Sequence, residues 1–265
     1  MYFFVGLAAP RPVLGLFSGK QPQNAPLLLG QLPVEDSVLR KSTNTFWPMA
    51  PAGIVPAPWF LTGHGAVFLY AFPKAFLRQF GFLDPDLCRQ HKLGLGAVMA
   101  VKYDTSGVGP YQELLFIPGI FRRGGKLTFA ISKIYVSTHA SAASGRENWG
   151  IPKEVADFHF RKQGDGTQLF DVSREGRTFF SAEVHPKGFS FPVTTKLLPL
   201  FRVVQERRGR LLLTQPQASG HAHLANVPYL EADAAYFPPV QHLKPLAVLA
   251  VQDFKMVFPV AEVLR

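Results

Sequence analysis

The sequence contains a single cysteine, Cys88, among its 265 residues. One cysteine cannot form a disulfide within the chain, and it cannot supply the four ligands of an all-cysteine metal site. The apolar runs are all too short to span a bilayer. The first nine residues are apolar but carry no early positive charge, and Pro10 follows at once. We therefore expect no disulfide framework, no membrane span and no signal peptide, and we predict a cytoplasmic protein.

Charged residues are also scarce, at 17% of the chain. The 18 acidic residues are outnumbered by 28 lysines and arginines, so the formal net charge is +10. The densest basic groups, at residues 122–126 and 207–210, form neither a long run nor an arginine-rich helix. This scatter argues against nucleic-acid binding. It favours attraction of a small anionic substrate, or simple solubility.

The residues that are abundant indicate a globular, β-rich protein. Hydrophobic residues make up 47%, and the chain has 23 prolines, 23 glycines and 24 phenylalanines, which suggests many turns and many aromatic strand residues. Residues 1–58 are rich in proline and glycine with weak periodicity. We predict that they form an N-terminal arm that wraps the body or a neighbouring subunit, with a partly disordered tail as the alternative. Residues 59–265 show no linker or repeat and are expected to form a single domain.

Hydrophobic periodicity and turn residues predict the elements of this domain. Strands are expected at residues 65–72, 95–103, 111–117, 127–138, 155–162, 169–173, 178–185, 210–214 and 248–260. Helices are expected at residues 73–80 and 194–204 and before Gly150. The three strands between residues 155 and 185 are joined by tight turns and should form a meander. Residues 221–229 have no clear period.

The most informative stretch is Ser144–Glu154, with the sequence SGRENWGIPKE. Gly150 can adopt the left-handed conformation that ends a helix, and Pro152 prevents the helix from continuing. Lys153 therefore follows a sharp corner, next to apolar neighbours. Lost hydration favours the neutral amine, and a neutral amine can attack a ketone carbon to form a Schiff base. The alternative is an ordinary solvated surface lysine.

A second stretch, residues 104–113 (DTSGVGPYQE), places a carboxylate on a predicted strand. Tyr111 and Glu113 are two residues apart, so both side chains point to the same face. An inward-facing carboxylate beside the apolar residues 114–116 can act as a general acid or base. The alternative is a glutamate at a strand edge that faces water.

Both stretches resemble signatures of one family. Gly145-Arg146-Glu147, followed by Gly150 and Ile151-Pro152-Lys153, is similar to the sequence around the Schiff-base lysine of the acetoacetate decarboxylase family. The Ser-Gly-x-Gly turn at residues 106–109, followed by Tyr111 and Glu113, resembles the segment that supplies an active-site glutamate. Residues 240–265 are similar to the family's C-terminal segment. The resemblance covers about residues 60–265.

The resemblance implies an α+β fold that is mostly β, an antiparallel β-barrel-like structure with a few short helices. It implies that Lys153 and Glu113 are catalytic, that no cofactor or metal is required, and that the partner is a small keto acid. It also implies a homo-oligomer. Residues in lesser roles, in substrate binding or support of the site, are expected to be Arg146, Glu147, Glu154, Tyr111 and His64.

The sequence departs from the family pattern at three places. Glu154 occupies the position where the decarboxylase has a second lysine. The stretch 97–99 has no acid where the family has a second glutamate, and residues 63–65 offer only His64 in place of a substrate-binding arginine. These departures weaken the case for acetoacetate as substrate more than the case for Schiff-base chemistry.

Several functions are therefore open. The first hypothesis is a lyase that decarboxylates a β-keto acid of the acetoacetate type through a lysine imine. The second is an aldolase or dehydratase that uses the same lysine on a pyruvate-like keto acid. The third is a non-catalytic member of the fold that binds a small molecule, and the fourth is a basic nucleic-acid-binding protein. The pair His221 and His223 could bind a metal, but no third ligand is evident, which favours histidines in a surface loop.

Overall fold

The computed structural model describes residues 53–197 and 201–264. The chain divides into two units, residues 1–47 and 48–265, and all described residues belong to the second. The predicted N-terminal arm at 1–58 therefore lies outside the described residues except for 53–58. Its role as a wrapping segment stays a prediction, as does the single domain at 59–265.

The larger of two sheets has ten strands. In spatial order they are β8 (Lys153–Val155), β7 (Lys133–Val136), β4 (Tyr111–Ile117), β3 (Leu95–Thr105), β1 (Trp59–Ala71), β15 (Ala247–Phe258), β14 (Gln217–Ala232), β11 (Arg177–Thr194), β10 (Gln168–Arg174) and β9 (Asp157–Lys162). Neighbouring strands are antiparallel except for β7 and β8, which are parallel. The predicted meander is confirmed by β9, β10 and β11.

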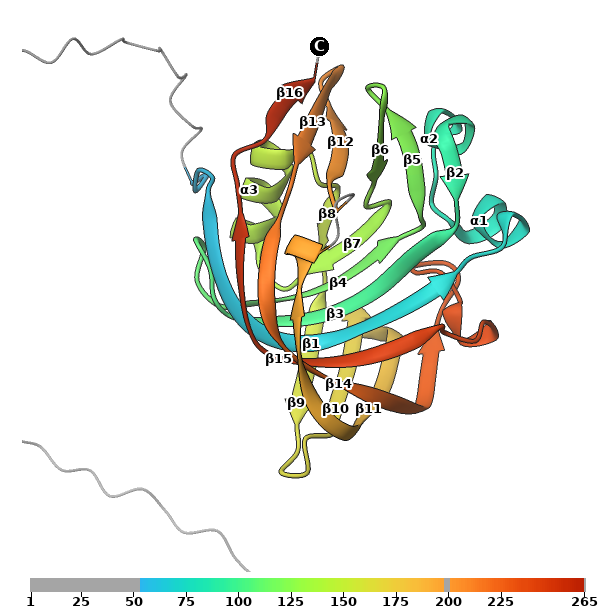
Figure 1. Ribbon diagram of the computed structural model, residues 1–265, viewed down its shortest axis with the longest axis vertical. Coiled ribbons are helices and arrows are strands. Elements are labelled where there is room, and N and C mark those ends of the chain that lie inside the picture. The colour runs from blue at the N-terminus through green and yellow to red at the C-terminus, as the bar shows by residue number, and fades with distance from the viewer. Residues whose placement is uncertain (1–52, 198–200, 265) are drawn as a thin grey trace, which may run out of the picture. The chain divides into compact units, whose positions relative to one another are not determined.

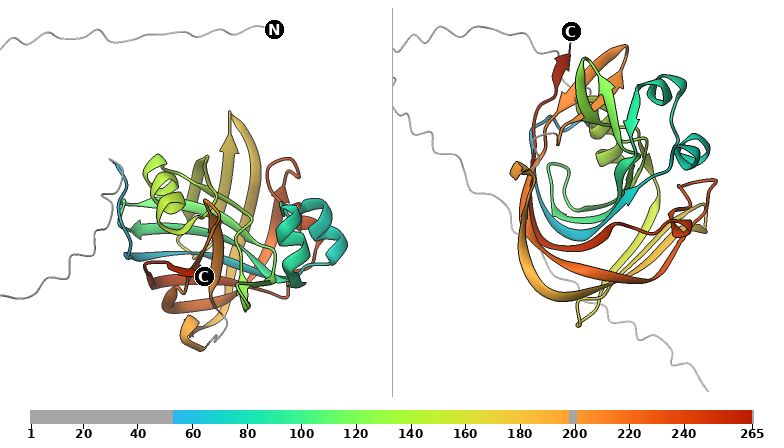
Figure 2. Two further views of the ribbon diagram at one scale, coloured as in Figure 1. Left: turned by 90° about the horizontal axis from the view of Figure 1, so that it is seen from above. Right: turned by 45° about the vertical axis from the view of Figure 1, so that its right-hand side comes forward.

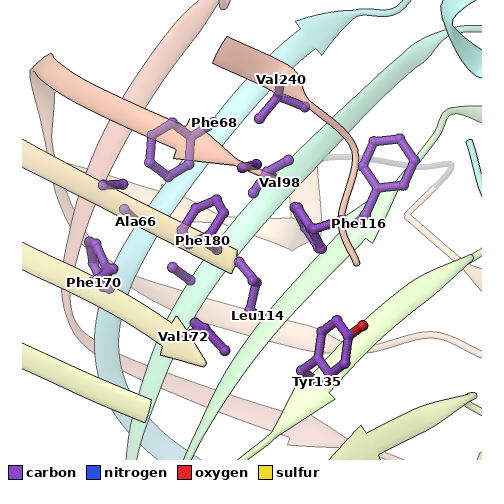
Figure 3. Close-up of a cluster of buried hydrophobic side chains, with 14 of the residues drawn as sticks. Ala66, Phe68, Val98, Leu114, Phe116, Tyr135, Phe170, Val172, Phe180 and Val240 are labelled. Carbon is purple, nitrogen blue, oxygen red and sulfur yellow. The ribbon is translucent and has the colours of Figure 1, made fainter. Parts of the chain in front are cut away.

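This sheet curls strongly, so that its two halves face each other (Figures 1 and 2). The inner face is filled by a large apolar cluster (Figure 3). Phe68, Val98 and Leu114 of one half meet Phe170 and Phe180 of the other half. The curled, nearly closed sheet confirms the prediction of a mostly β, barrel-like fold.

The smaller sheet has six strands. In spatial order they are β16 (Glu262–Leu264), β13 (Arg210–Thr214), β12 (Val203–Arg207), β6 (Lys126–Phe129), β5 (Ile120–Arg123) and β2 (His91–Leu93). The helices are α1 (Lys74–Phe80), α2 (Pro85–Gln90) and α3 (His139–Trp149), with short 3-10 turns at Thr195–Leu197 and Val240–His242. Within the described ranges, no helix has the length and apolar character needed to cross a membrane.

A second apolar cluster covers the outer face of the large sheet. It joins alternate residues of β1, β3 and β4, such as Leu61, Tyr103 and Leu115, to Trp149 of α3 and Val203 of β12. Figure 1 shows α3 and the smaller sheet lying over this face. The outer face therefore has a dry layer of its own, separate from the interior of the curled sheet.

Three element predictions are corrected by the structure. Residues 127–138 do not form one strand: β6 belongs to the smaller sheet and β7 to the larger one, with residues 130–132 between them. Residues 194–204 are not a helix, because a 3-10 turn at Thr195–Leu197 is followed by β12 from Val203. Residues 221–229 are part of β14, where register shifts against both neighbouring strands obscure the two-residue period.

Candidate active site

The sharp corner before Lys153 is present in the structure. Helix α3 ends at Gly150, whose φ of 68° is the left-handed conformation, and its N–H donates a hydrogen bond to the Arg146 carbonyl. Such a capping geometry strongly favours glycine. Residues 151 and 152 turn the chain, and Lys153 is the first residue of β8, parallel to β7. The lysine is therefore fixed from both sides, by a capped helix and by a paired strand.

Lys153 points into the dry layer between the outer face of the sheet and α3. Its side chain is 4% exposed. The stem lies against Gly145, because a Cβ at that position would come within 2.6 Å of the Lys153 Cδ. The ammonium group lies over two aromatic rings, 5.0 Å from the centre of Tyr111 and 5.9 Å from the centre of Trp59. The expectation of a solvated surface lysine does not describe this position.

The Lys153 ammonium meets three acceptors. Its Nζ lies 2.8 Å from Glu113 Oε2 and donates hydrogen bonds to Ser141 Oγ at 3.1 Å and to Tyr111 Oη at 3.4 Å. An ammonium group has three N–H donors, so each can be matched. A buried charge requires such a set of partners.

Glu113 divides its two oxygens between two partners. Oε2 faces Lys153, whereas Oε1 accepts a hydrogen bond of 3.0 Å from Tyr103 Oη. The side chain is 5% exposed. Strands β3 and β4 bring these groups together, because Tyr103 is paired directly with Tyr111 and Val101 with Glu113. The expectation of an edge glutamate facing water does not describe this residue either.

Both tyrosines of the site stay protonated over a wide pH range. Burial raises the pKa of the Tyr103 phenol well above its ordinary value, and the negative charge of Glu113 raises it further. Burial and Glu113 act in the same way on the pKa of Tyr111. The two hydroxyls therefore serve as neutral hydrogen-bond groups. The site as a whole can hold one proton shared between an amine and a carboxylate, beside hydroxyls that can polarise a carbonyl oxygen.

Arg146 and Glu147 hold the corner from outside. Arg146 Nε donates a hydrogen bond of 2.8 Å to the backbone carbonyl of Lys153. Glu147 forms an ion pair with Arg207 of β12, and Arg207 also donates to the Glu147 carbonyl. These contacts tie α3 to β8 and to the smaller sheet. The structure gives neither residue a side-chain contact with the Lys153 amine.

Glu154 points away from the amine, as strand alternation requires. Its carboxylate lies 2.5 Å from Lys133 Nζ and 2.9 Å from Arg174 Nη1. Burial alone would raise its pKa, but hydrogen bonds and positive charge from Lys133 and Arg174 lower the pKa overall. The anion that replaces the family's second lysine is thus neutralised on the other side of the strand.

The candidate histidines lie elsewhere. His64 alternates with Gly63 and Gly65 on β1, and its Nδ1 is 3.6 Å from Asp104 Oδ2. Its side chain falls on the inner-face side of β1 with Ala66, opposite the layer that holds Lys153. His221 and His223 lie on β14. Within the described ranges, no cluster of three or more His, Cys, Asp or Glu residues is arranged to hold a metal.

Sequence reasoning missed Tyr103, Ser141 and Trp59. Tyr103 and Trp59 come from strands distant from Lys153 in the sequence, and Ser141 lies 12 residues before it in α3, so no local motif contains all of them. One signal for Ser141 was available: it belongs to the run of small residues 140–145, and small residues let a helix approach a sheet closely. Tyr103 offered only its place in an alternating strand, which it shares with many core residues.

Comparison with known proteins places this geometry in context. Residues 46–214 match the family described as acetoacetate decarboxylase (ADC). The chain superimposes on an acetoacetate decarboxylase from Legionella pneumophila subsp. pneumophila str. Philadelphia 1 with a TM-score of 0.66, at 17% identity, covering 84% of this chain and 93% of the other. It also resembles the enduracididine biosynthesis enzyme MppR complexed with pyruvate, with a TM-score of 0.55 at 16% identity, over 80% and 92% of the two chains. At these identities, both similarities establish a shared fold.

A curated relative is the Protein NEOXANTHIN-DEFICIENT 1 of Oryza sativa subsp. japonica. It is 27% identical over 101 residues, which is 38% of this chain and 33% of the relative. The match thus spans about a third of that relative's length.

Proposed function

The chain belongs to the acetoacetate decarboxylase family, and we propose that it is a Schiff-base-forming lyase that decarboxylates a β-keto acid of the acetoacetate type. The nucleophile is Lys153. The observation that carries the proposal is the buried contact of 2.8 Å between Lys153 Nζ and Glu113 Oε2. An amine must lose a proton before it can attack a carbonyl, and Glu113 is a base within direct reach of that proton.

In the first step, the ammonium of Lys153 passes a proton to Glu113 Oε2. The pair changes from two charged groups to a neutral amine and a neutral acid, so the net charge of the site is unchanged. The amine then forms a C–N bond with the keto carbon. The keto oxygen takes protons from the site and leaves as water, which returns Glu113 to a carboxylate and leaves a protonated imine on Lys153.

The protonated imine is the electron sink for the second step. The bond between the α-carbon and the substrate carboxylate breaks, its electron pair forms the C=C bond of an enamine, and carbon dioxide leaves. A proton added to the enamine carbon regenerates an imine, and water releases the ketone and restores Lys153. Each step moves protons and electron pairs only, so no redox partner enters the balance.

The neighbouring hydroxyls act on the oxygen that becomes water. Tyr111 and Ser141 lie 3.4 and 3.1 Å from Lys153 Nζ. The keto oxygen is bonded to the carbon that Nζ attacks, so it passes close to the same hydroxyls. Donors placed where negative charge develops stabilise the transition state. The aromatic surroundings exclude water, which strengthens these interactions.

A second candidate function is an aldolase or dehydratase acting on a pyruvate-like keto acid through the same lysine. The fold neighbour MppR supports it, because that enzyme has been seen with pyruvate and with the condensation product of pyruvate and imidazole 4-carboxaldehyde. The departures from the decarboxylase pattern support it too: residues 97–99 and His64 lack the expected substrate-recognition groups, and Glu154 replaces the second lysine. Both reactions begin with the same imine and part only afterwards.

Borohydride trapping tests the shared step. The protein is incubated with acetoacetate, pyruvate and longer keto acids, reduced with borohydride, and mapped by peptide mass spectrometry. We expect a stable adduct on Lys153 and none in Lys153→Met. The matched control is Lys133→Met, which removes a partly buried lysine of the adjacent strand β7 and should leave trapping intact.

The same samples separate the alternatives. Carbon dioxide release with acetoacetate supports the decarboxylase, whereas an adduct with pyruvate, and a new condensation product when an aldehyde is added, supports the aldolase. Absence of any adduct, in protein whose circular dichroism shows the folded state, would falsify the Schiff-base proposal. It would leave the chain as a small-molecule-binding member of the family.

A further inference from the structure

We infer that Tyr103 is a positioning residue, which fixes the Glu113 carboxylate so that only Oε2 exchanges protons with the substrate imine. This inference rests on the proposed Schiff-base function. The Tyr103 hydroxyl lies 3.0 Å from Oε1, while Oε2 lies 2.8 Å from Lys153 Nζ. The two oxygens of one carboxylate thus have different partners, one a neutral phenol and the other the reacting amine.

The Tyr103 ring is held rigidly enough for this role. It is 5% exposed. The ring lies 4.5 Å from the ring of Tyr111, centre to centre, and meets the ring of Phe254 edge-on at 5.8 Å. Strand β3 is paired with β1 on one side and β4 on the other, which fixes the backbone as well. Because the ring is fixed, its hydroxyl stays in one position. The Glu113 Oε1 that this hydroxyl binds is held in one position as well.

Tyr103 can only donate to Glu113. A carboxylate has no hydrogen to give, and burial raises the pKa of the Tyr103 phenol well above its ordinary value, so the phenol keeps its proton. Oε1 therefore has a permanent partner and is the poorer acceptor for a further proton. When Lys153 becomes an imine, its nitrogen carries a single hydrogen for three acceptors, so Oε2 no longer has a partner of its own.

The step that depends on this arrangement is proton transfer at the substrate α-carbon. The C–H bond of the protonated imine breaks, the proton goes to Oε2, and the electron pair forms the enamine C=C bond. The reverse step returns a proton from Oε2 to carbon. Catalytic proton transfer requires the acceptor within hydrogen-bond reach and in the correct direction. A carboxylate that can rotate would offer that geometry only part of the time.

The groups facing Glu113 are Lys153 from β8 and the neutral phenols of Tyr103 from β3 and Tyr111 from β4. Without the Tyr103 hydroxyl, Oε1 has no fixed partner and the carboxylate is free to rotate. Proton transfer at the substrate α-carbon should then slow, because Oε2 is correctly placed only part of the time.

The test is exchange of the methyl hydrogens of acetone and of pyruvate in D₂O, followed by NMR, beside borohydride trapping of the same two compounds. For Tyr103→Phe we expect trapping at saturating substrate to stay close to wild type. Exchange per trapped imine should fall by about tenfold, which corresponds to the loss of one charge-assisted hydrogen bond.

Tyr70→Phe is the matched control. Tyr70 is as buried as Tyr103, lies on the inner-face side of β1, and has a hydroxyl that, among the described residues, has no hydrogen-bond partner. Its removal should leave exchange per trapped imine unchanged. Phe254→Leu is a second variant, which keeps the Tyr103 hydroxyl but loosens its ring, and should slow exchange in the same direction by a smaller factor.

The outcomes distinguish failure of the proposed function from failure of the role of Tyr103. If wild type traps neither compound nor any keto acid, the proposed function fails. If wild type traps and exchanges, but Tyr103→Phe and Phe254→Leu match it in exchange per imine, the role of Tyr103 is overturned and the Schiff-base function stands.

Discussion

Gly145 and Lys153 lie in direct contact where α3 crosses β8. A Cβ on Gly145 would come within 2.6 Å of Lys153 Cδ and 2.8 Å of Cε. Gly145 lies within the regular helix α3, so the requirement here is for space rather than for an unusual backbone conformation. Gly145 and Lys153 of the SGRENWGIPKE stretch pack directly against each other, and this contact sets the direction in which the Lys153 amine points.

Gly145→Ala should therefore disable the lysine without unfolding the protein. The added methyl group must displace either the helix or the lysine stem, and the stem has no free space because three partners hold its end. We expect the rate of imine trapping to fall about tenfold or more, since misplaced reacting groups lose much of the advantage of proximity. Trapping rates at saturating keto acid measure the effect.

The control for this variant is Gly164→Ala. Gly164 lies between β9 and β10, has no neighbour within 4 Å of an added Cβ, and has no positive φ. We expect the Gly164→Ala variant to be trapped as an imine at the wild-type rate. An unchanged trapping rate in Gly145→Ala would mean that the lysine stem adapts, and that the glycine does not direct the amine.

Much of this site could be predicted because its core is local in sequence. The helix stop at Gly150, the corner and the strand that carries Lys153 follow from backbone preferences of a few adjacent residues. The strand of Tyr111 and Glu113 follows from a turn and a two-residue period. The structure has both features where the pattern placed them.

The remainder depends on which strands become neighbours. Tyr103 reaches Glu113 because β3 pairs with β4 in one register. Ser141 reaches Lys153 because α3 lies across the outer face of the sheet. The same limit explains the error at residues 127–138, where a continuous apolar pattern conceals a change from one sheet to the other. The pairing of strands that are far apart in the sequence cannot be inferred from a short window of residues.

Glu113→Gln should cost about 3 kcal/mol in the free energy of unfolding, because it leaves a buried ammonium without its counter-charge. The double variant Lys153→Met with Glu113→Gln should recover most of that loss. It contains no unpaired charge, and the amide oxygen can still accept from Tyr103. Urea unfolding measures both values.

Asp86→Asn is the comparison for this cycle. It breaks the ion pair of Arg89 and Asp86, whose side chains are 71% and 62% exposed, so the loss should stay below about 1 kcal/mol. If Glu113→Gln costs no more than Asp86→Asn, the ion pair of Lys153 and Glu113 does not hold the resting site together.

Glu154→Gln should leave imine trapping and its pH dependence unchanged, because the carboxylate faces Lys133 and Arg174 rather than the amine. Its lowered pKa predicts a small stabilising effect that is present above about pH 4.5 and is lost as the pH falls further. The side chain is partly exposed, so solvent limits this effect to about 1 kcal/mol or less. Imine trapping by Glu154→Gln across pH 5–9 should match wild type. A shifted pH profile of trapping would show that Glu154 does act on the amine.

The raised pKa values of Tyr103 and Tyr111 predict how the stability of the folded protein falls at high pH. Their pKa values are raised well above the ordinary value, chiefly by burial. The folded state therefore keeps two protons that the unfolded chain releases above about pH 10, so stability is intact below that pH and falls as the pH rises further. Each tyrosine should contribute about 1.4 kcal/mol per pH unit to this slope. Urea unfolding of wild type, Tyr103→Phe and Tyr111→Phe between pH 9 and 11 measures this slope, and each variant should show a shallower slope than wild type.

Tyrosinate absorbance, followed in the folded protein and in urea, provides an independent check. If both phenols ionise in the folded protein near pH 10, the site is open to water, and the dry environment that the lysine chemistry requires is absent.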